Sequence, residues 1–155
     1  MKSETSFIPP AADPAWRVAI IHSSYYPEEV GALVASAKDA LLRSGIPEKN
    51  ISLHAVHGSF EIPLIGSVIA ETKKADAMIG IGIIVEGETE HARLIAESAA
   101  QGMMEIQVQH GIPFAFEVLH VRSLADAKAR ADKGAEAAVA VLRSLSEKAR
   151  VKGHL

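Results

Sequence analysis

Two kinds of hydrophobic pattern follow one another along the chain. Apolar runs at 18–22, 77–85 and 114–119 indicate buried strands, and 51–56 alternates apolar and polar residues, as a half-buried or edge strand does. Between and after them, apolar residues recur at helical spacing over about 28–44, 62–71, 90–108 and 123–149, the last with an interruption near 132–134. The run 77–85 has no polar alternation, which is typical of a central parallel strand covered on both faces.

Residues with known preferences at helix ends support these boundaries. Gly45, followed by Pro47, ends the first helix, and Pro63 suits the first turn of the second. Thr89 and Ser123 are candidate N-caps of the two helices that follow. Because strands alternate with helices, the sequence predicts a flavodoxin-like three-layer α/β/α sandwich around a four-stranded parallel sheet.

The first 15 residues differ from the rest, because they hold three of the seven prolines and show no periodicity. We expect an extended N-terminal arm over 1–15, with Phe7 and Ile8 available to a neighbouring subunit, or else a disordered tail. Residues 16–155 are expected to form one α/β domain, since a chain of 155 residues can bury a core of its own.

Composition excludes several classes of function. The net charge of −3 leaves no basic surface for nucleic acid, and the absence of cysteine excludes disulfides, thiolate nucleophiles and Cys-ligated zinc. Charged residues and glycines interrupt every apolar run before the roughly 18 residues that a membrane span needs, and no secretory signal is visible at the N-terminus. We therefore expect a cytoplasmic protein with neither a membrane nor a nucleic acid as partner.

Four loops follow the predicted strands, at 23–27, 57–61, 86–91 and 120–123. In an open α/β sheet these loops meet at the carboxyl ends of the strands, where ligands bind. The side chains they offer include aromatic rings, hydrogen-bonding groups and one imidazole: Tyr25, Tyr26, Ser59, Phe60, Glu61, Glu88, Thr89 and His91. Such a set can stack on a flat ring, read its polar atoms and move protons near neutral pH.

His91 is the strongest catalytic candidate, because it follows Thr89 into the first turn of a helix, beside free backbone N–H groups. His57 lies close to the same expected site, but the spacing of the histidines gives no metal-ligand set. A signalling receiver domain would need acidic residues after the first strand, and a flavodoxin-type electron carrier a Gly-rich phosphate loop there. The residues His22-Ser23-Ser24-Tyr25-Tyr26 offer neither.

Three motifs in one order carry a resemblance to a known family. They are Gly58-Ser59-Phe60-Glu61-Ile62-Pro63, Gly87-Glu88-Thr89-Glu90-His91 and Asp132-Lys133-Gly134-Ala135-Glu136-Ala137-Ala138. Together, over about 16–146, the chain resembles the lumazine synthase (6,7-dimethyl-8-ribityllumazine synthase) family. The resemblance implies a transferase of riboflavin biosynthesis that uses neither a metal nor a cofactor. It would condense 5-amino-6-ribitylaminouracil with 3,4-dihydroxy-2-butanone 4-phosphate, releasing phosphate and water.

The resemblance also implies roles for residues on the first three of these four loops. Tyr25 would stack on the pyrimidine, Ser59 and Glu61 would bind the ribityl chain and its neighbours, and His91 would be the general acid and base. Phe60 of the same loop is a further substrate-binding candidate. Read without the resemblance, Tyr25 and Tyr26 could be packed loop aromatics, and Glu61 could cap its own helix.

The phosphate and the neighbouring subunit account for the remaining implied residues. Gly87, Glu88 and Thr89 match the phosphate-holding turn, and Arg130 matches the phosphate-binding arginine, although it could equally be a solvated helical charge. Phe116 matches an aromatic contributed by the adjacent subunit, and Lys133 matches the lysine of the third motif. The implied assembly is a homopentamer, with an icosahedral capsid of 60 subunits as the alternative and riboflavin synthase as a candidate partner.

A second class of function stays open at this stage. The chain has Glu86 before the glycine of the phosphate turn, His120-Val121 after the fourth strand, and a short link between Arg130 and Lys133. Each of these departs from the family's usual pattern. They motivate the alternative of a non-catalytic paralogue that binds a flavin or lumazine, or forms a shell, without turnover.

Overall fold

The sheet has four strands, as the sequence predicts. The computed structural model describes residues 10–153. Its strands are β1 (Val18–Ser23), β2 (Ile51–Val56), β3 (Ala77–Val85) and β4 (Phe114–Val121), in the spatial order β2-β1-β3-β4. Every neighbouring pair is parallel. The prediction of a four-stranded parallel sheet is therefore confirmed, and β2 is an edge strand, in agreement with its alternating sequence.

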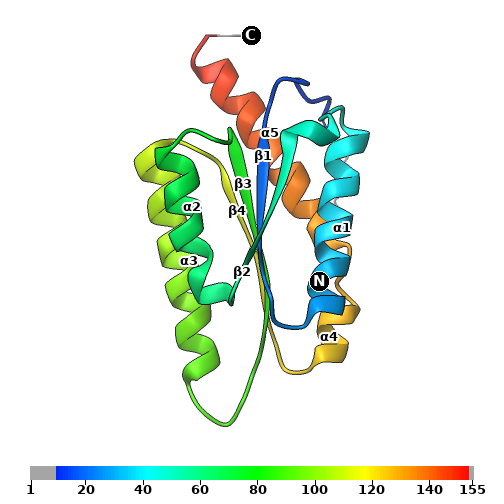
Figure 1. The fold of residues 1–155 in the computed structure, drawn as a ribbon, viewed down its shortest axis with the longest axis vertical. Coiled ribbons are helices and arrows are strands. Elements are labelled where there is room, and N and C mark those ends of the chain that lie inside the picture. Colours follow the sequence, from blue (N-terminus) through cyan, green and yellow to red (C-terminus); the bar gives the residue numbers. More distant parts are fainter. Residues whose placement is uncertain (1–9, 154–155) are drawn as a thin grey trace.

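Helices cover both faces of this sheet (Figure 1). On one face lie α1 (Pro27–Arg43), the short α4 (Leu124–Lys128) and α5 (Lys133–Val151), and on the other lie α2 (Ile62–Glu71) and α3 (His91–His110). Two single 3₁₀ turns, η1 (Glu48–Asn50) and η2 (Ser59–Glu61), flank β2. This is the predicted flavodoxin-like sandwich, and the predicted interruption of the last helix is the turn over residues 129–132 between α4 and α5.

Strand β3 is the centre of the core, because eight of its nine residues are buried. Alternate residues face opposite layers: Ile79 packs with Leu33 and Leu142 under α1 and α5, whereas Met78 packs with Met103 under α2 and α3. A strand with two buried faces needs apolar residues at every position. That requirement explains the uninterrupted apolar run in the sequence.

Local signals at the helix ends are confirmed in most places. Gly45 follows α1 with φ 107°, a left-handed conformation that glycine adopts without a steric penalty, and Ser123 Oγ accepts a hydrogen bond from Asp126 N–H at the start of α4. Thr89 differs from expectation, because the N-cap position of α3 belongs to Glu90. The Thr89 hydroxyl still accepts a bond from the His91 N–H, at 3.3 Å.

The last residues of the expected N-terminal arm contact their own domain. Ala12 N–H donates to the Ser44 carbonyl at 2.9 Å, and Asn50 Nδ2 donates to the Pro14 carbonyl at 3.0 Å. These two bonds tie the segment before β1 to the end of α1 and to the η1 turn before β2. Phe7 and Ile8, predicted to reach a neighbouring subunit, lie outside the described residues.

Candidate functional site

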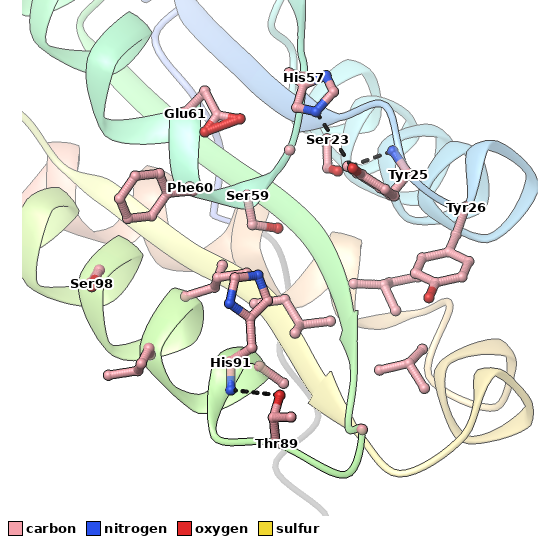
Figure 2. Close-up of a pocket in the computed structure, with 18 residues that line it drawn as sticks. Ser23, Tyr25, Tyr26, His57, Ser59, Phe60, Glu61, Thr89, His91 and Ser98 are labelled. Carbon is pink, nitrogen blue, oxygen red and sulfur yellow. Dashed lines mark hydrogen bonds between the residues drawn. The ribbon is translucent and has the colours of Figure 1, made fainter.

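The carboxyl ends of β1 and β3 and the loop after β2 open into a cavity of ≈ 690 Å³ beside the first turns of α3 (Figure 2). It lies where a parallel sheet is expected to place its ligand site. Its lining comes from the β1–α1 loop, the β2–α2 loop, the end of β3 and one face of α3. In chain order, the lining residues are Ser23, Tyr25, Tyr26, His57, Gly58, Ser59, Phe60, Glu61, Ile83, Ile84, Val85, Gly87, Thr89, His91, Ala92, Leu94, Ile95 and Ser98.

Two tyrosines form the wall that follows β1. The Tyr25 side chain is 53% exposed, and its backbone N–H donates to the buried hydroxyl of Ser23 at 3.1 Å. Tyr26 has φ 53°, an unusual left-handed conformation for a residue other than glycine, at the start of α1. The Tyr25 ring contacts the rings of Tyr26 and His57 and is not part of the core, so its stacking role stays a prediction. Tyr26 packs in part against the core under α1.

The loop after β2 places a serine against the central strand. Ser59 is only 5% exposed, and a Cβ on Gly82 would lie 2.1 Å from Ser59 Oγ. Glycine at position 82 therefore makes room for Ser59 where the loop crosses β3. Glu61 occupies the N-cap position of α2 but makes no capping hydrogen bond with its side chain, and it lines the cavity instead.

We expect the change Gly82→Ala to weaken ligand binding more than it weakens the fold. The new methyl group would displace the Ser59 hydroxyl, and a displaced polar contact costs on the order of 1–2 kcal/mol, or roughly tenfold in affinity. Fluorescence titration with 6,7-dimethyl-8-ribityllumazine measures this effect. Gly31→Ala is the matched control, because a Cβ there meets nothing within 4 Å and Gly31 does not line the cavity. Equal affinities for Gly82→Ala and the unchanged protein would contradict the prediction.

The floor of the cavity is the first part of α3. His91 is exposed in the first helical turn, and the residues that follow it on the same face, Ile95 and Ser98, also line the cavity. The start of a helix offers free N–H groups and the positive end of the helix dipole, which together favour an anion. The His91 imidazole therefore lies next to a position suited to an anion.

The acidic residues of the β3–α3 turn do not line this cavity. Glu86, Glu88 and Glu90 are all exposed and absent from its lining. Glu90 accepts a hydrogen bond from Arg93 Nε at 2.6 Å, and Arg93 also lies 3.5 Å from Glu97. The Glu90 carboxylate is thus paired on the outer surface of α3. Repulsion of an anion inside the cavity is correspondingly weaker than the sequence alone suggests.

The structure brings together most of the site residues predicted from the sequence. Those that line the cavity are Tyr25, Ser59, Phe60, Glu61, Gly87, Thr89 and His91. Those that do not are Glu88, Phe116, Arg130 and Lys133. Three of the four loops expected to converge therefore contribute, and the loop at 120–123 contributes no lining residue. The roles of all these residues stay predictions.

The four residues outside the lining lie in two places. Glu88 is exposed in the β3–α3 turn itself. Phe116, 43% exposed, lies on the edge strand β4, Arg130 lies in the exposed turn after α4, and Lys133 begins α5. None of the last three lines the cavity of its own chain.

Lys133 belongs to a small charged cluster between α5 and β4. Its Nζ lies 2.9 Å from Glu136 Oε2, and this hydrogen bond, followed by the charge of Glu136, raises the pKa of the lysine. Nearby on β4, burial raises the pKa of Glu117 to about 7, although the Lys133 charge lowers it and the Glu136 charge raises it further. No sequence signal marks Glu117, because its burial arises only when α5 packs on β4.

Glu117 predicts a pH dependence of stability. Because folding raises the pKa of this carboxyl from 4.5 to about 7, the folded state holds the proton more tightly than the unfolded state. The stability contributed by the proton is present below the unfolded pKa and is lost as pH rises through 7. Relative to Glu117→Gln, the free energy of unfolding should fall by about 2 kcal/mol between about pH 5 and pH 8. Urea unfolding at pH 5 and pH 8 measures this change in the free energy of unfolding, and Glu71→Gln, at an exposed position, is the control. Parallel pH profiles for the protein and Glu117→Gln would refute it.

Several lining residues escaped prediction from the sequence. Ile95 and Ser98 lie four and seven residues after His91, so the helical repeat that places one on the cavity places the others there too. That signal was available in the sequence. Ile83 and Ile84 carried no usable signal, because buried apolar strand residues look alike whether or not a cavity lies beside them.

Neither a metal centre nor a membrane-spanning helix is found among the described residues. Over residues 10–153, no group of three or more His, Asp or Glu side chains is arranged to hold a metal ion. Within that same range, no helix combines the length and the apolar character needed to cross a bilayer.

A parallel α/β sandwich with an open cavity at the strand ends, and an imidazole at the start of a helix beside it, belongs to the class of small-molecule enzymes. The model of the 6,7-dimethyl-8-ribityllumazine synthase family matches residues 15–149. The chain belongs to this family, a family of transferases in riboflavin biosynthesis.

Named relatives agree with this membership. The 6,7-dimethyl-8-ribityllumazine synthases of three Xylella fastidiosa strains (M12, M23 and Temecula1) are each 36% identical over 135 residues, covering 84% of this chain and 88% of theirs. Among solved structures, a de novo designed Rossmann fold protein, ROS2_835, is 18% identical with a TM-score of 0.45, covering 77% of this chain and 98% of that one.

Proposed function

We propose that the protein catalyses the condensation of 5-amino-6-ribitylaminouracil with 3,4-dihydroxy-2-butanone 4-phosphate to 6,7-dimethyl-8-ribityllumazine. The observation that carries the proposal is the convergence of two separate family motifs on one cavity. Ser59 and Glu61 of the first motif lie on its wall, and Thr89 and His91 of the second lie at its floor. Xylella fastidiosa proteins of the same family bear the name of this activity.

The residues suit the steps of this reaction. The exposed Tyr25 ring offers a face on which a pyrimidine can stack. Thr89 and the free N–H groups at the start of α3 suit the phosphate of the second substrate, and binding both substrates in one cavity supplies orientation, a large part of the acceleration. His91 moves protons as the amine condenses with the ketone with loss of one water, phosphate leaves, and the ring closes with loss of a second water.

A neighbouring subunit completes the site in this proposal. No lysine or arginine lines the cavity within the described part of the chain, so a phosphate there would meet no cationic side chain from its own subunit. Arg130 and Lys133, with Phe116, would supply the missing contacts from the next copy of a homo-oligomer. Their position outside their own cavity and the exposure of Phe116 and Arg130 support this arrangement.

The experiment is to mix the purified protein with both substrates and to follow lumazine by absorbance and fluorescence, with phosphate release measured in parallel. Product and phosphate should appear in equal amounts, faster than in the uncatalysed reaction. Omitting either substrate is the control. Formation at the uncatalysed rate by a folded protein would refute the synthase activity.

A second candidate function is binding of a lumazine or flavin without turnover. The specific observation in its favour is the engagement of Lys133 by Glu136, since a lysine held by a carboxylate of its own helix is less available to a phosphate. Under this alternative, fluorescence titration detects bound lumazine while the assay above detects no product. The two measurements together separate the candidates.

A further inference from the structure

The ring of Tyr25 is held in place by its neighbour across the cavity wall. The His57 ring meets it edge to face, with ring centroids 5.5 Å apart and planes at 81°, and the Tyr25 hydroxyl lies 3.4 Å from His57 Nε2 (Figure 2). Gly58 lies against another side of the Tyr25 ring, since a Cβ built on this glycine would lie 3.3 Å from Tyr25 Cε2. A histidine and a glycine from one loop thus restrict a tyrosine from another.

Two hydrogen bonds from Ser24 also join the first loop to the main chain of the second. Ser24 Oγ donates to the Val56 carbonyl at 2.6 Å, and Ser24 N–H donates to the His57 carbonyl at 3.3 Å. These bonds hold the residue before Tyr25 against the residue before Gly58. The contact between the Tyr25 and His57 rings therefore joins two segments whose main chains are already fixed to one another.

Restriction of this kind matters for an exposed aromatic residue. Tyr25 is 53% exposed, so packing against the core does not select its side-chain rotamer. An unrestricted ring would lose rotamer freedom on stacking against a ligand, and that loss would oppose binding. A partner that fixes the ring beforehand removes part of this cost.

We propose that His57 is a positioning residue that orients Tyr25 for stacking on the heteroaromatic ring of the substrate or product. The inference rests on the proposed function, since it concerns the ligand of the same cavity. His57 acts on the ligand through Tyr25, and its role differs from that of His91, which lies at the start of α3 on the far side of the cavity (Figure 2). Position 57 thereby becomes a determinant of affinity for flat rings.

A double-mutant cycle tests this directly. The probe is 6,7-dimethyl-8-ribityllumazine, titrated by fluorescence into the protein and into His57→Ala, Tyr25→Ala and the double variant. In the background that keeps Tyr25, His57→Ala should raise Kd about threefold to tenfold, as expected for coupled neighbours. In the Tyr25→Ala background, the same change should leave Kd unaltered, because the residue through which His57 acts is gone. A purely structural role would weaken binding in both backgrounds.

Further variants keep the test decisive. His57→Phe retains the ring edge and should recover part of the affinity lost in His57→Ala. His54→Ala is the matched control, since His54 lies on β2 outside the cavity lining and bonds Ser52 instead. Thermal unfolding of each variant verifies the fold.

The outcomes separate the inference from the function on which it rests. Equal fold-changes in both backgrounds, or unaltered affinity in His57→Ala, would overturn the role of His57 while leaving lumazine binding intact. A wild-type protein that binds no lumazine would overturn both this inference and the proposed function.

Discussion

Replacing His91 by alanine is expected to slow lumazine formation about 100-fold and to leave measurable product. A positioned general acid or base contributes on the order of 10²–10⁴ in rate, and the lower end applies where orientation of two substrates supplies much of the remainder. The exposed His91 ring at the cavity floor is placed to shuttle protons, while Tyr25, Ser59 and Thr89 would still hold the substrates. Steady-state assays with both substrates at saturating concentration measure the effect.

His110→Ala is the matched control for this prediction. His110 is the last residue of the same helix and does not line the cavity, so its removal changes α3 at the opposite end. Its rate should stay within about twofold of the unchanged protein. If His91→Ala forms no detectable product, orientation of the substrates alone contributes little to the rate. If its rate is unchanged, His91 does not act as the general acid or base.

Replacing Gly134 by alanine is expected to destabilise the fold by about 3 kcal/mol or more, the upper range for forcing a methyl group into a packed interior. A Cβ on Gly134 would lie 2.0 Å from the Leu33 carbonyl oxygen and 2.9 Å from the Ala37 nitrogen, both backbone atoms of α1. Backbone cannot rotate away as a side chain can. Helices α1 and α5 would have to separate, and the core of Leu33, Val141 and Leu142 between helices and sheet would loosen.

Gly31→Ala gives the control, because Gly31 lies on the exposed side of α1 and a Cβ there meets nothing within 4 Å. Within a helix, alanine is more favourable than glycine by about 1 kcal/mol, so this variant should be slightly more stable. Urea unfolding of both variants measures the two opposite shifts. Similar stabilities for Gly134→Ala and the unchanged protein would contradict the close helix contact.

Gly134 also shows how a motif can serve more than one purpose. In the sequence, Asp132-Lys133-Gly134 supported the resemblance to a synthase family, and Lys133 was its candidate binding residue. The structure gives the glycine a separate purpose, since it lets α5 cross α1 at backbone contact. Gly82 also has a packing purpose, because it lies inside β3 and its missing side chain makes room for Ser59.

The sequence by itself determined the strands, the helices and the candidate residues that line the cavity at one edge of the sheet. Period-two and period-3.6 patterns are local, and so are the loops that follow each strand, so His91, Ser59 and Tyr25 could be placed at one sheet edge before any packing was known. The loop after β4 was expected there too, yet it lines no part of the cavity.

Only the tertiary structure decided which residues of different elements contact one another. The contact between Tyr25 and His57, the burial that raises the pKa of Glu117, and the outward pairing of Glu90 with Arg93 join residues whose meeting depends on how loops and helices pack. The same holds for Arg130, which the family resemblance assigns to the site and which does not line the cavity of its own chain. Sequence periodicity records which face of an element is buried, whereas contacts between elements depend on distances that no local pattern contains.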